Sequence, residues 1–343
     1  MFKNISIIGD GGMGTVLAML LCEKQDSSVA QQVTSVRMWG YDRKQLEEIE
    51  QNRENKKFLP SYKLPEALLF EADDERIMDG ADLIVSAVPC QFMRRVWSRL
   101  KSYVPEKVPI VSVAKGIEND TLLRPSQILS EILDEKRKTR FAVLSGPTIA
   151  DELARRLPAT ACAAAEDGKL AQKIQHTFSD GVPWLRVYSN TDIVGVELAG
   201  AMKNIIAIAA GIIDGTGVGD NAKAALLTRG LAEITRLGLA MGARQETFAG
   251  LAGLGDLVTT CISPTGRNRS FGERIGKGQT TEQALGVNES VVEGVATCKS
   301  VIALAGKYNV EMPITEAVHE VLFENKPVLR AIEDLMEREL KAE

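Results

Sequence analysis

Lys203 stands where an ordinary surface charge is not expected. It lies in the segment Glu197 to Gly211, which is apolar on nearly all sides of a helix, so its amine is predicted in or beside the protein interior. Burial and a neighbouring cation both lower the pKa of a lysine from about 10.4, which makes the amine a proton donor and acceptor near neutrality. We interpret Lys203 as a candidate general acid–base group. The alternative is a lysine that extends along its apolar stem and places its charge in water.

Further polar residues follow strand-like segments. Lys115 ends one apolar run, and Gly146 and Thr148 come directly after another, Phe141 to Leu144. In parallel sheets, ligands collect beyond the carboxyl ends of the strands, so these residues are predicted to line a substrate site. For Thr148 an equal alternative is a capping role, because Thr148 and Asp151 have the spacing of a capping box.

Glycine-marked turns in the second half of the chain carry charges. Gly255 precedes Asp256, and Gly266 precedes Arg267 and Asn268. An arginine in such a turn can hold a phosphate through two parallel hydrogen bonds. Together with the two lysines, these turns indicate a site for a small anion that carries a reducible carbonyl.

The segment Gly9-Asp10-Gly11-Gly12-Met13-Gly14 has the spacing G-x-G-x-x-G, directly after the apolar run 5–8 and at the start of a helical pattern. This context predicts a dinucleotide-binding turn. Gly9 permits the tight bend, Gly11 lets the backbone approach a pyrophosphate, and Gly14 allows close packing of helix on sheet. The N–H groups at the helix N-terminus favour an anion. A glycine turn that holds no ligand is the alternative.

The residues themselves leave the choice between NAD and NADP open. An acidic side chain after the second strand, Val36 to Trp39, would bind a ribose hydroxyl, whereas a basic one would pair with a 2′-phosphate. Both types are present, as Asp42 and Arg43, and each could equally be a solvated loop charge.

Strand-like and helical segments alternate over the first half of the chain. The expected strands are Ile5 to Ile8, Val36 to Trp39, Ala81 to Val88, Pro109 to Ala114 and Phe141 to Leu144. Their order predicts an α/β domain with a mostly parallel sheet and helices on both faces. After Tyr188 the patterns are long and helical. We therefore expect a dinucleotide-binding Rossmann domain over residues 1–190 and an all-helical substrate and catalytic domain over residues 191–343.

Composition excludes several classes of protein. A net charge of −5 and a pI near 5.4 argue against nucleic acid as a partner. The five cysteines are scattered and never spaced as C-x-x-C, so neither a disulfide framework nor a metal site is predicted. The chain starts without a signal-peptide pattern, and Leu198 to Ile213 is only 16 residues long, so we expect a cytoplasmic protein with no membrane span.

Eight segments, in order, resemble bacterial-type NAD(P)-dependent glycerol-3-phosphate dehydrogenase over about residues 4–325: GDGGMGTVLA, SVAKGIE, SGPTIADEL, ELAGAMKNIIAIAAG, AGLGDLVTTC, GRNRSFG, VVEG and EMPIT. The resemblance implies a Rossmann domain joined to an all-α domain of the 6-phosphogluconate dehydrogenase type. It also implies reversible hydride transfer between NAD(P)H and dihydroxyacetone phosphate, giving sn-glycerol 3-phosphate for glycerophospholipid synthesis. A homodimer is compatible with it, and the sequence leaves the oligomeric state open.

Carried over position by position, the resemblance implies that Lys203 is the proton acceptor and that Lys115 and Asp256 belong to the same catalytic group. The implied substrate contacts are Lys115, Gly146, Thr148, Lys203, Asp256, Gly266, Arg267 and Asn268. To Gly9, Gly11 and Gly14 of the turn it adds, as cofactor contacts, Gly12, Met13, Tyr41, Lys115, Ala150, Arg267, Val291 and Glu293.

The chain departs from the family pattern at four of these positions. Gly12 and Met13 replace a serine and an aromatic residue, which removes one hydrogen bond to phosphate. Tyr41 replaces a basic residue and weakens the case for NADPH over NADH. Gly266 stands where serine is common, so only backbone is left for that substrate contact.

Two other functions stay open at this point. One is a related dehydrogenase that acts on a 3-hydroxy acid or a ketoacid, which should lack the turn at Arg267 and Asn268. The other is a dinucleotide sensor without turnover, against which the intact Lys203 speaks.

Overall fold

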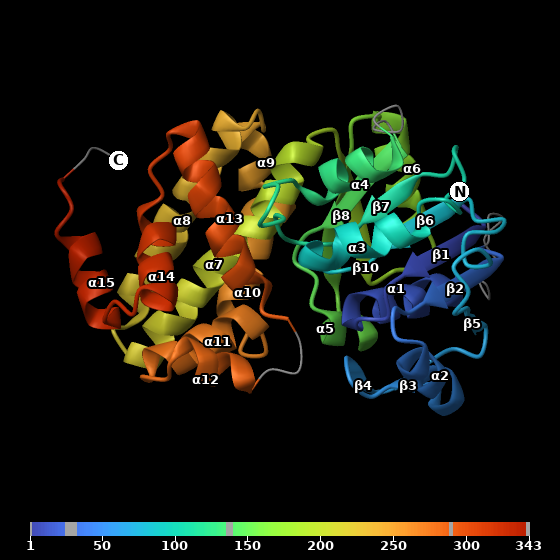
Figure 1. Ribbon diagram of the computed structural model, residues 1–343, viewed down its shortest axis with the longest axis horizontal. Coiled ribbons are helices and arrows are strands. Elements are labelled where there is room, and N and C mark those ends of the chain that lie inside the picture. The colour runs from blue at the N-terminus through green and yellow to red at the C-terminus, as the bar shows by residue number, and fades with distance from the viewer. Residues whose placement is uncertain (1, 25–32, 135–139, 288–290, 341–343) are drawn as a thin grey trace. The chain divides into compact units, whose positions relative to one another are not determined.

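The computed structural model describes residues 2–24, 33–134, 140–287 and 291–340 (Figure 1). The chain forms two compact units, Met1–Lys115 with Arg124–Val196, and Gly116–Leu123 with Glu197–Glu343. The sequence predicts a single break after residue 190, whereas the units part at Val196 and the segment 116–123 packs with the second unit. Ser300 Oγ helps to hold this segment there, because it donates a hydrogen bond of 2.9 Å to the carbonyl of Ile117.

The first unit is built on an eight-stranded sheet of order β10-β9-β8-β7-β6-β1-β2-β5. Its strands are β1 (Asn4–Ile8), β2 (Ser35–Trp39), β5 (Leu68–Phe70), β6 (Leu83–Ser86), β7 (Ile110–Ser112), β8 (Phe141–Ser145), β9 (Ala159–Ala165) and β10 (Leu185–Asn190). All neighbouring pairs are parallel except β8 and β9. The five predicted strands and the mostly parallel sheet are confirmed.

Three strands of this sheet were not predicted from the sequence. β9 reads ATACAAA, and alanine has a low preference for strands, yet five of its seven residues are buried between β8 and β10. β5 has only three residues, too few for a recognisable alternation. Pairing with neighbours that are distant in sequence, rather than local preference, makes these segments strands.

Helices connect the strands of the first unit. They are α1 (Gly12–Glu23), α2 (Arg43–Asn52), α3 (Cys90–Leu100), α4 (Pro125–Leu133), α5 (Ala150–Ala154) and α6 (Gly168–Ser179). A separate antiparallel hairpin consists of β3 (Glu54–Asn55) and β4 (Leu59–Lys63). α1 packs against α5, and α3 against α4 (Figure 1).

The part of the second unit that the structure describes is helical. Its α-helices are α7 (Ile193–Thr216), α8 (Asp220–Ala240), α9 (Gln245–Ala249), α10 (Asp256–Ile262), α11 (Arg267–Gly276), α12 (Thr281–Gly286), α13 (Glu293–Tyr308), α14 (Pro313–Phe323) and α15 (Val328–Met336). A π-helical turn, Leu251–Gly255, leads into α10. The helical fold predicted for this half is confirmed.

α7 is longer than predicted. It runs for 24 residues, against the helical pattern predicted over Val194 to Ile213, so it is long and apolar enough to cross a membrane and the length of the apolar segment 198–213 does not exclude a span. However, 89% of its most apolar window of 18 residues is buried inside the protein. Packing against other helices therefore accounts for its apolar surface, as expected for a core helix.

Glycines bring α7 and α11 into backbone contact. Gly211 and Gly215 on α7 lie four residues apart, as do Gly272 and Gly276 on α11. A Cβ added to any of the four would lie between 1.9 and 2.4 Å from a carbonyl oxygen of the other helix. Only glycine permits this approach, which fixes the start of α11 beside the middle of α7.

Candidate functional site

The glycine turn between β1 and α1 has the geometry that its sequence predicts. Gly9 has φ of +116°, a conformation that favours glycine, and a Cβ on Gly14 would lie 2.2 Å from the Gly9 carbonyl oxygen. Gly11 precedes α1 as its N-cap, and a Cβ there would meet nothing within 4 Å. The start of α1 therefore has space beside Gly11 for an anion, which is what a pyrophosphate requires.

A hairpin residue that the sequence analysis did not identify supports this turn. Asn55 on β3 is 1% exposed, and its Nδ2 donates to the carbonyl of Asp10 at 2.7 Å and to Thr15 Oγ1 at 2.8 Å. The same hairpin explains one departure from the family pattern. A Cβ on Gly12 would lie 2.7 Å from the carbonyl oxygen of Phe58, so a serine would not fit there without movement.

Asp42, after the end of β2, has a structural role. Asp42 is the N-cap of α2, and its Oδ1 accepts hydrogen bonds from the backbone N–H groups of Lys44 at 3.0 Å and Gln45 at 3.4 Å. Its position is explained by helix capping. Arg43 is the first residue of α2 and is exposed.

Lys115 and Thr148 converge on one backbone group. Lys115 Nζ and Thr148 Oγ1 each donate a hydrogen bond of 3.1 Å to the carbonyl of Gly146. The capping alternative for Thr148 is wrong, because α5 starts after Ile149 and has no side-chain cap. Lys115, Thr148 and Met13 line the same pocket of the first unit. The structure thus brings together residues from β7, β8 and the glycine turn.

Lys203 is buried, as predicted, with 6% of its surface exposed. Its Nζ donates to Asp256 Oδ1 at 2.6 Å and to Thr260 Oγ1 at 2.5 Å. Asp256, the first residue of α10, is only 1% exposed, so the lysine and the carboxylate form a buried ion pair. Such a pair needs partners for both charges and holds the amine in one orientation.

Asn268 joins three helices. Its Nδ2 donates to Asn204 Oδ1 at 3.0 Å, and its Oδ1 accepts the N–H of Gly294 at 3.0 Å. Asn204 is the residue after Lys203 on α7, so Asn268 ties α11 to the chain segment that carries the buried amine. Asn268 is 8% exposed, and one of its two amide hydrogens is used in this contact.

Arg267 occupies the first position of α11, after Gly266 as N-cap. Its side chain is exposed, and its Nη1 donates to the carbonyl of Val291 at 3.2 Å. Val291 lies two residues before Glu293, the first residue of α13. The structure therefore brings together three of the predicted cofactor positions, Arg267, Val291 and Glu293, within the second unit. Ala150 lies beside Gly12 in the first unit, where its Cβ would be 3.8 Å from a Cβ on Gly12.

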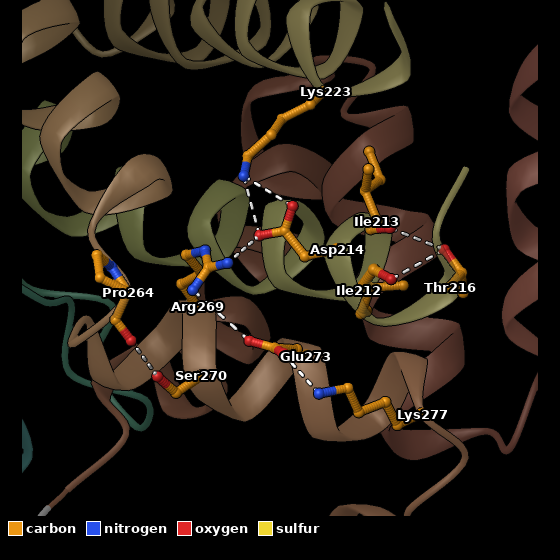
Figure 2. Close-up of polar contacts among 10 residues, drawn as sticks. All are labelled: Ile212, Ile213, Asp214, Thr216, Lys223, Pro264, Arg269, Ser270, Glu273 and Lys277. Atoms are coloured by element: carbon orange, nitrogen blue, oxygen red, sulfur yellow. Dashed lines mark hydrogen bonds and ion pairs between the residues drawn. The ribbon is translucent and has the colours of Figure 1, made fainter. Parts of the chain in front are cut away.

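A charged network that begins at Arg269, two residues after Arg267, holds α11 against α7. Figure 2 shows Asp214 between Lys223 and Arg269, with Glu273 between Arg269 and Lys277. Asp214 Oδ1 lies 2.7 Å from Lys223 Nζ, and Asp214 Oδ2 lies 2.6 Å from Arg269 Nη2. These contacts reinforce the glycine-mediated crossing and so fix the start of α11.

The described residues also include potential metal ligands and thiols. Within them, no group of three or more His, Cys, Asp or Glu side chains is arranged to hold a metal ion. The five cysteines are free and buried, and burial raises the pKa of the Cys261 thiol, which lies near the Lys203 and Asp256 pair, to about 12.

Comparison with known families decides the chain's membership. The family model of the NAD-dependent glycerol-3-phosphate dehydrogenase N-terminus matches residues 4–171, and that of the C-terminus matches residues 192–333. The chain belongs to the NAD-dependent glycerol-3-phosphate dehydrogenase family.

Full-length relatives exist within this dehydrogenase family. Glycerol-3-phosphate dehydrogenase (NAD(P)+) of Geobacter sp. strain M21 is 47% identical over 343 residues, covering 100% of this chain and 99% of the relative. The enzyme of the same name from Chlorobium phaeobacteroides strain BS1 is 46% identical and covers 99% of each chain. A crystal structure of glycerol-3-phosphate dehydrogenase from Coxiella burnetii is 36% identical, has a TM-score of 0.90, and covers 98% of this chain and 99% of its own.

Besides Asn55, two further residues of the candidate site were missed in the sequence analysis. Thr260 lies one helical turn after Asp256, so the i, i+4 spacing on α10 was an available signal. Asn204 directly follows Lys203, but its contact with Asn268 crosses 64 residues and has no local signal.

Proposed function

We propose that this chain is an NAD(P)-dependent sn-glycerol-3-phosphate dehydrogenase that interconverts dihydroxyacetone phosphate and sn-glycerol 3-phosphate. The observation that carries the proposal is the buried Lys203, held between Asp256 and Thr260 in a member of this family. Relatives that match over the full length bear this enzyme name. We assign the activity to the cytoplasm and to glycerophospholipid synthesis.

The glycine turn is proposed to hold the dinucleotide. Gly11 leaves open space at the N-terminus of α1, and Gly9 and Gly14 make the bend that places it there. We assign the other cofactor contacts to Gly12, Met13, Tyr41, Lys115, Ala150, Arg267, Val291 and Glu293. When bound, the nicotinamide supplies a hydride to the carbonyl carbon of the substrate.

Lys203 is proposed to donate the proton that the carbonyl oxygen needs as it becomes a hydroxyl, and to accept it in the reverse direction. Asp256 and Thr260 accept hydrogen bonds from the ammonium and so orient it. A positioned proton donor of this kind contributes roughly 10²- to 10⁴-fold to rate.

The phosphate is assigned to the start of α11. Arg267 offers a planar guanidinium there, and Asn268 retains a second amide hydrogen beyond the one given to Asn204. Gly266 contributes backbone only. From the first unit, Lys115, Gly146 and Thr148 are assigned to the same substrate, with Lys115 as a second cation.

The test is the variant Lys203→Ala, assayed for oxidation of NADH and NADPH with dihydroxyacetone phosphate. We expect kcat to fall at least about 100-fold, with the Kd for NADH unchanged. Lys307→Met removes an exposed lysine of the same unit, on α13, and serves as the control, with kcat expected near wild type. Undiminished turnover in Lys203→Ala would overturn the role of Lys203, whereas a wild type that binds the dinucleotide without turnover would favour a dinucleotide sensor. Light scattering of the purified protein tests whether it is a homodimer, which the sequence leaves open.

A further inference from the structure

The edge of the proposed dinucleotide site at the end of β2 lacks the basic residue that often binds a 2′-phosphate. Tyr41 occupies that place and is 45% exposed. Asp42, next in the chain, caps α2 through two backbone N–H groups. From the local sequence alone, recognition of a 2′-phosphate here therefore depends on Arg43 or is lost.

The structure brings two cations to Tyr41 from another helix. Arg95 and Arg99 lie four residues apart on α3 and so share one face of it. The guanidinium carbon of Arg95 lies 5.1 Å from the centre of the Tyr41 ring, and that of Arg99 lies 5.7 Å from it. The Tyr41 ring thus contacts the guanidinium groups of Arg95 and Arg99, which lie 54 and 58 positions away in sequence.

These two arginines differ in their charge compensation. Arg99 binds Asp74 through two hydrogen bonds, Nε to Oδ2 at 2.5 Å and Nη2 to Oδ1 at 2.7 Å. The same carboxylate accepts a hydrogen bond of 3.1 Å from Nε1 of Trp39, the last residue of β2, which holds Asp74 beside this strand. Arg95 is exposed, and among the described residues no carboxylate forms an ion pair with it. Arg95 therefore presents the net positive charge at this edge.

A further acidic residue beside the end of β2, Asp10, has a hydrogen-bond partner of its own. Asp10 lies beneath Gly40, where a Cβ would be 2.9 Å from its Oδ2. That oxygen accepts a hydrogen bond of 2.7 Å from Gln45 Nε2, and burial raises the pKa of the carboxyl group. Asp10 is therefore engaged by Gln45 of α2, while Arg95 lies over the ring of the exposed Tyr41.

We propose that Arg95, stacked on Tyr41, binds the 2′-phosphate of NADPH and supplies the cation that the sequence lacks after β2. A guanidinium can stack on an aromatic ring and at the same time donate two parallel hydrogen bonds to a phosphate. This inference rests on the proposed dinucleotide site and adds its selectivity for NADP(H). A charge-assisted contact of this kind corresponds to a preference of about tenfold to a hundredfold.

The experiment measures equilibrium binding rather than turnover. Calorimetric Kd values for NADPH, NADH, adenosine 2′,5′-bisphosphate and adenosine 5′-monophosphate are compared for wild type, Arg95→Met and Arg43→Met. We expect Arg95→Met to weaken NADPH and the bisphosphate at least about tenfold while NADH and the monophosphate change less than about twofold. Arg43→Met, which removes the exposed arginine two residues after Tyr41, is the matched control and should leave all four values near wild type.

Each other outcome has a defined meaning. Equal weakening of NADH and NADPH by Arg95→Met, an unchanged NADPH affinity, or a loss of 2′-phosphate binding in Arg43→Met instead would overturn the role of Arg95. Wild-type protein that binds NADH and NADPH equally would also overturn it, while the dinucleotide site would stand. If the folded wild-type protein binds none of the four nucleotides, the proposed function itself is contradicted.

Discussion

Glycines determine geometry in both units, but for different reasons. In the first unit, Gly9 and Gly14 close a bend of six residues, while Gly11 is left with open space beside it. In the second unit, Gly211 and Gly272 leave no space at all, because each meets the backbone of the other helix. The first cluster makes room for a ligand, whereas the second removes the room between two helices. Glycine thus leaves space for a ligand in one unit and permits close helix packing in the other.

The charges that accompany the two clusters differ as well. At the far end of α1, Lys24 is 2% exposed and its amine donates to the carbonyl of Thr177 at 2.5 Å, near the end of α6. In the second unit, Arg269 binds the carboxylate of Asp214 (Figure 2). The end of α1 is thus held by hydrogen bonds from the Lys24 ammonium to carbonyl groups, whereas α11 is held to α7 by an ion pair.

Among the variants that test this comparison, Gly272→Ala should show the largest effect on stability. A Cβ there would lie 2.0 Å from the carbonyl oxygen of Ile208, and backbone cannot swing aside as a side chain can. We expect the free energy of unfolding in urea to fall by about 3 kcal/mol or more, with kcat falling as α11 moves. Gly306→Ala on α13 has nothing within 4 Å of the new Cβ and should be neutral or up to about 1 kcal/mol more stable. Equal stability of the two variants would contradict the backbone crossing.

The contrast in charges predicts a pH effect in the first unit. Burial lowers the pKa of Lys24 to about 8, from 10.5. The unfolded chain therefore binds more protons than the folded protein between these pH values, and stability rises with pH across that window. Measured against Lys24→Met, which cancels the titration of other groups, wild type should gain on the order of 2 kcal/mol between pH 7 and pH 10.5. Parallel stability curves for the two proteins would show that the amine is not desolvated.

The smallest effect is expected at Gly11, where stability and binding should separate. Because a Cβ on Gly11 meets nothing within 4 Å, Gly11→Ala should change the free energy of unfolding by less than about 0.5 kcal/mol. The same methyl group enters the space proposed for the pyrophosphate, so the Kd for NADH should rise about tenfold, or 1.4 kcal/mol. Calorimetry and urea denaturation of one preparation give both numbers. Retained affinity would place the pyrophosphate elsewhere.

The parts of the fold that were predicted correctly have short-range causes. The glycine turn follows β1 directly, and the apolar pattern around Lys203 indicates a buried amine within one helix. β9 was missed because its alanines are strand residues only between β8 and β10. Of the two alternatives for Thr148, the capping role is wrong because α5 starts two residues later, at Ala150, and the hydroxyl donates to the carbonyl of Gly146.

By itself, the sequence determined the class of fold, the place of the glycine turn and the candidates Lys203, Asp256 and Arg267, since each depends on neighbours within a few residues. Only the tertiary structure decided what those candidates contact. Asn204 and Asn268 are 64 positions apart, and Tyr41 and Arg95 belong to different elements. Such contacts arise when packed helices and strands bring distant segments within hydrogen-bonding or stacking range, and no local pattern records which segments will meet.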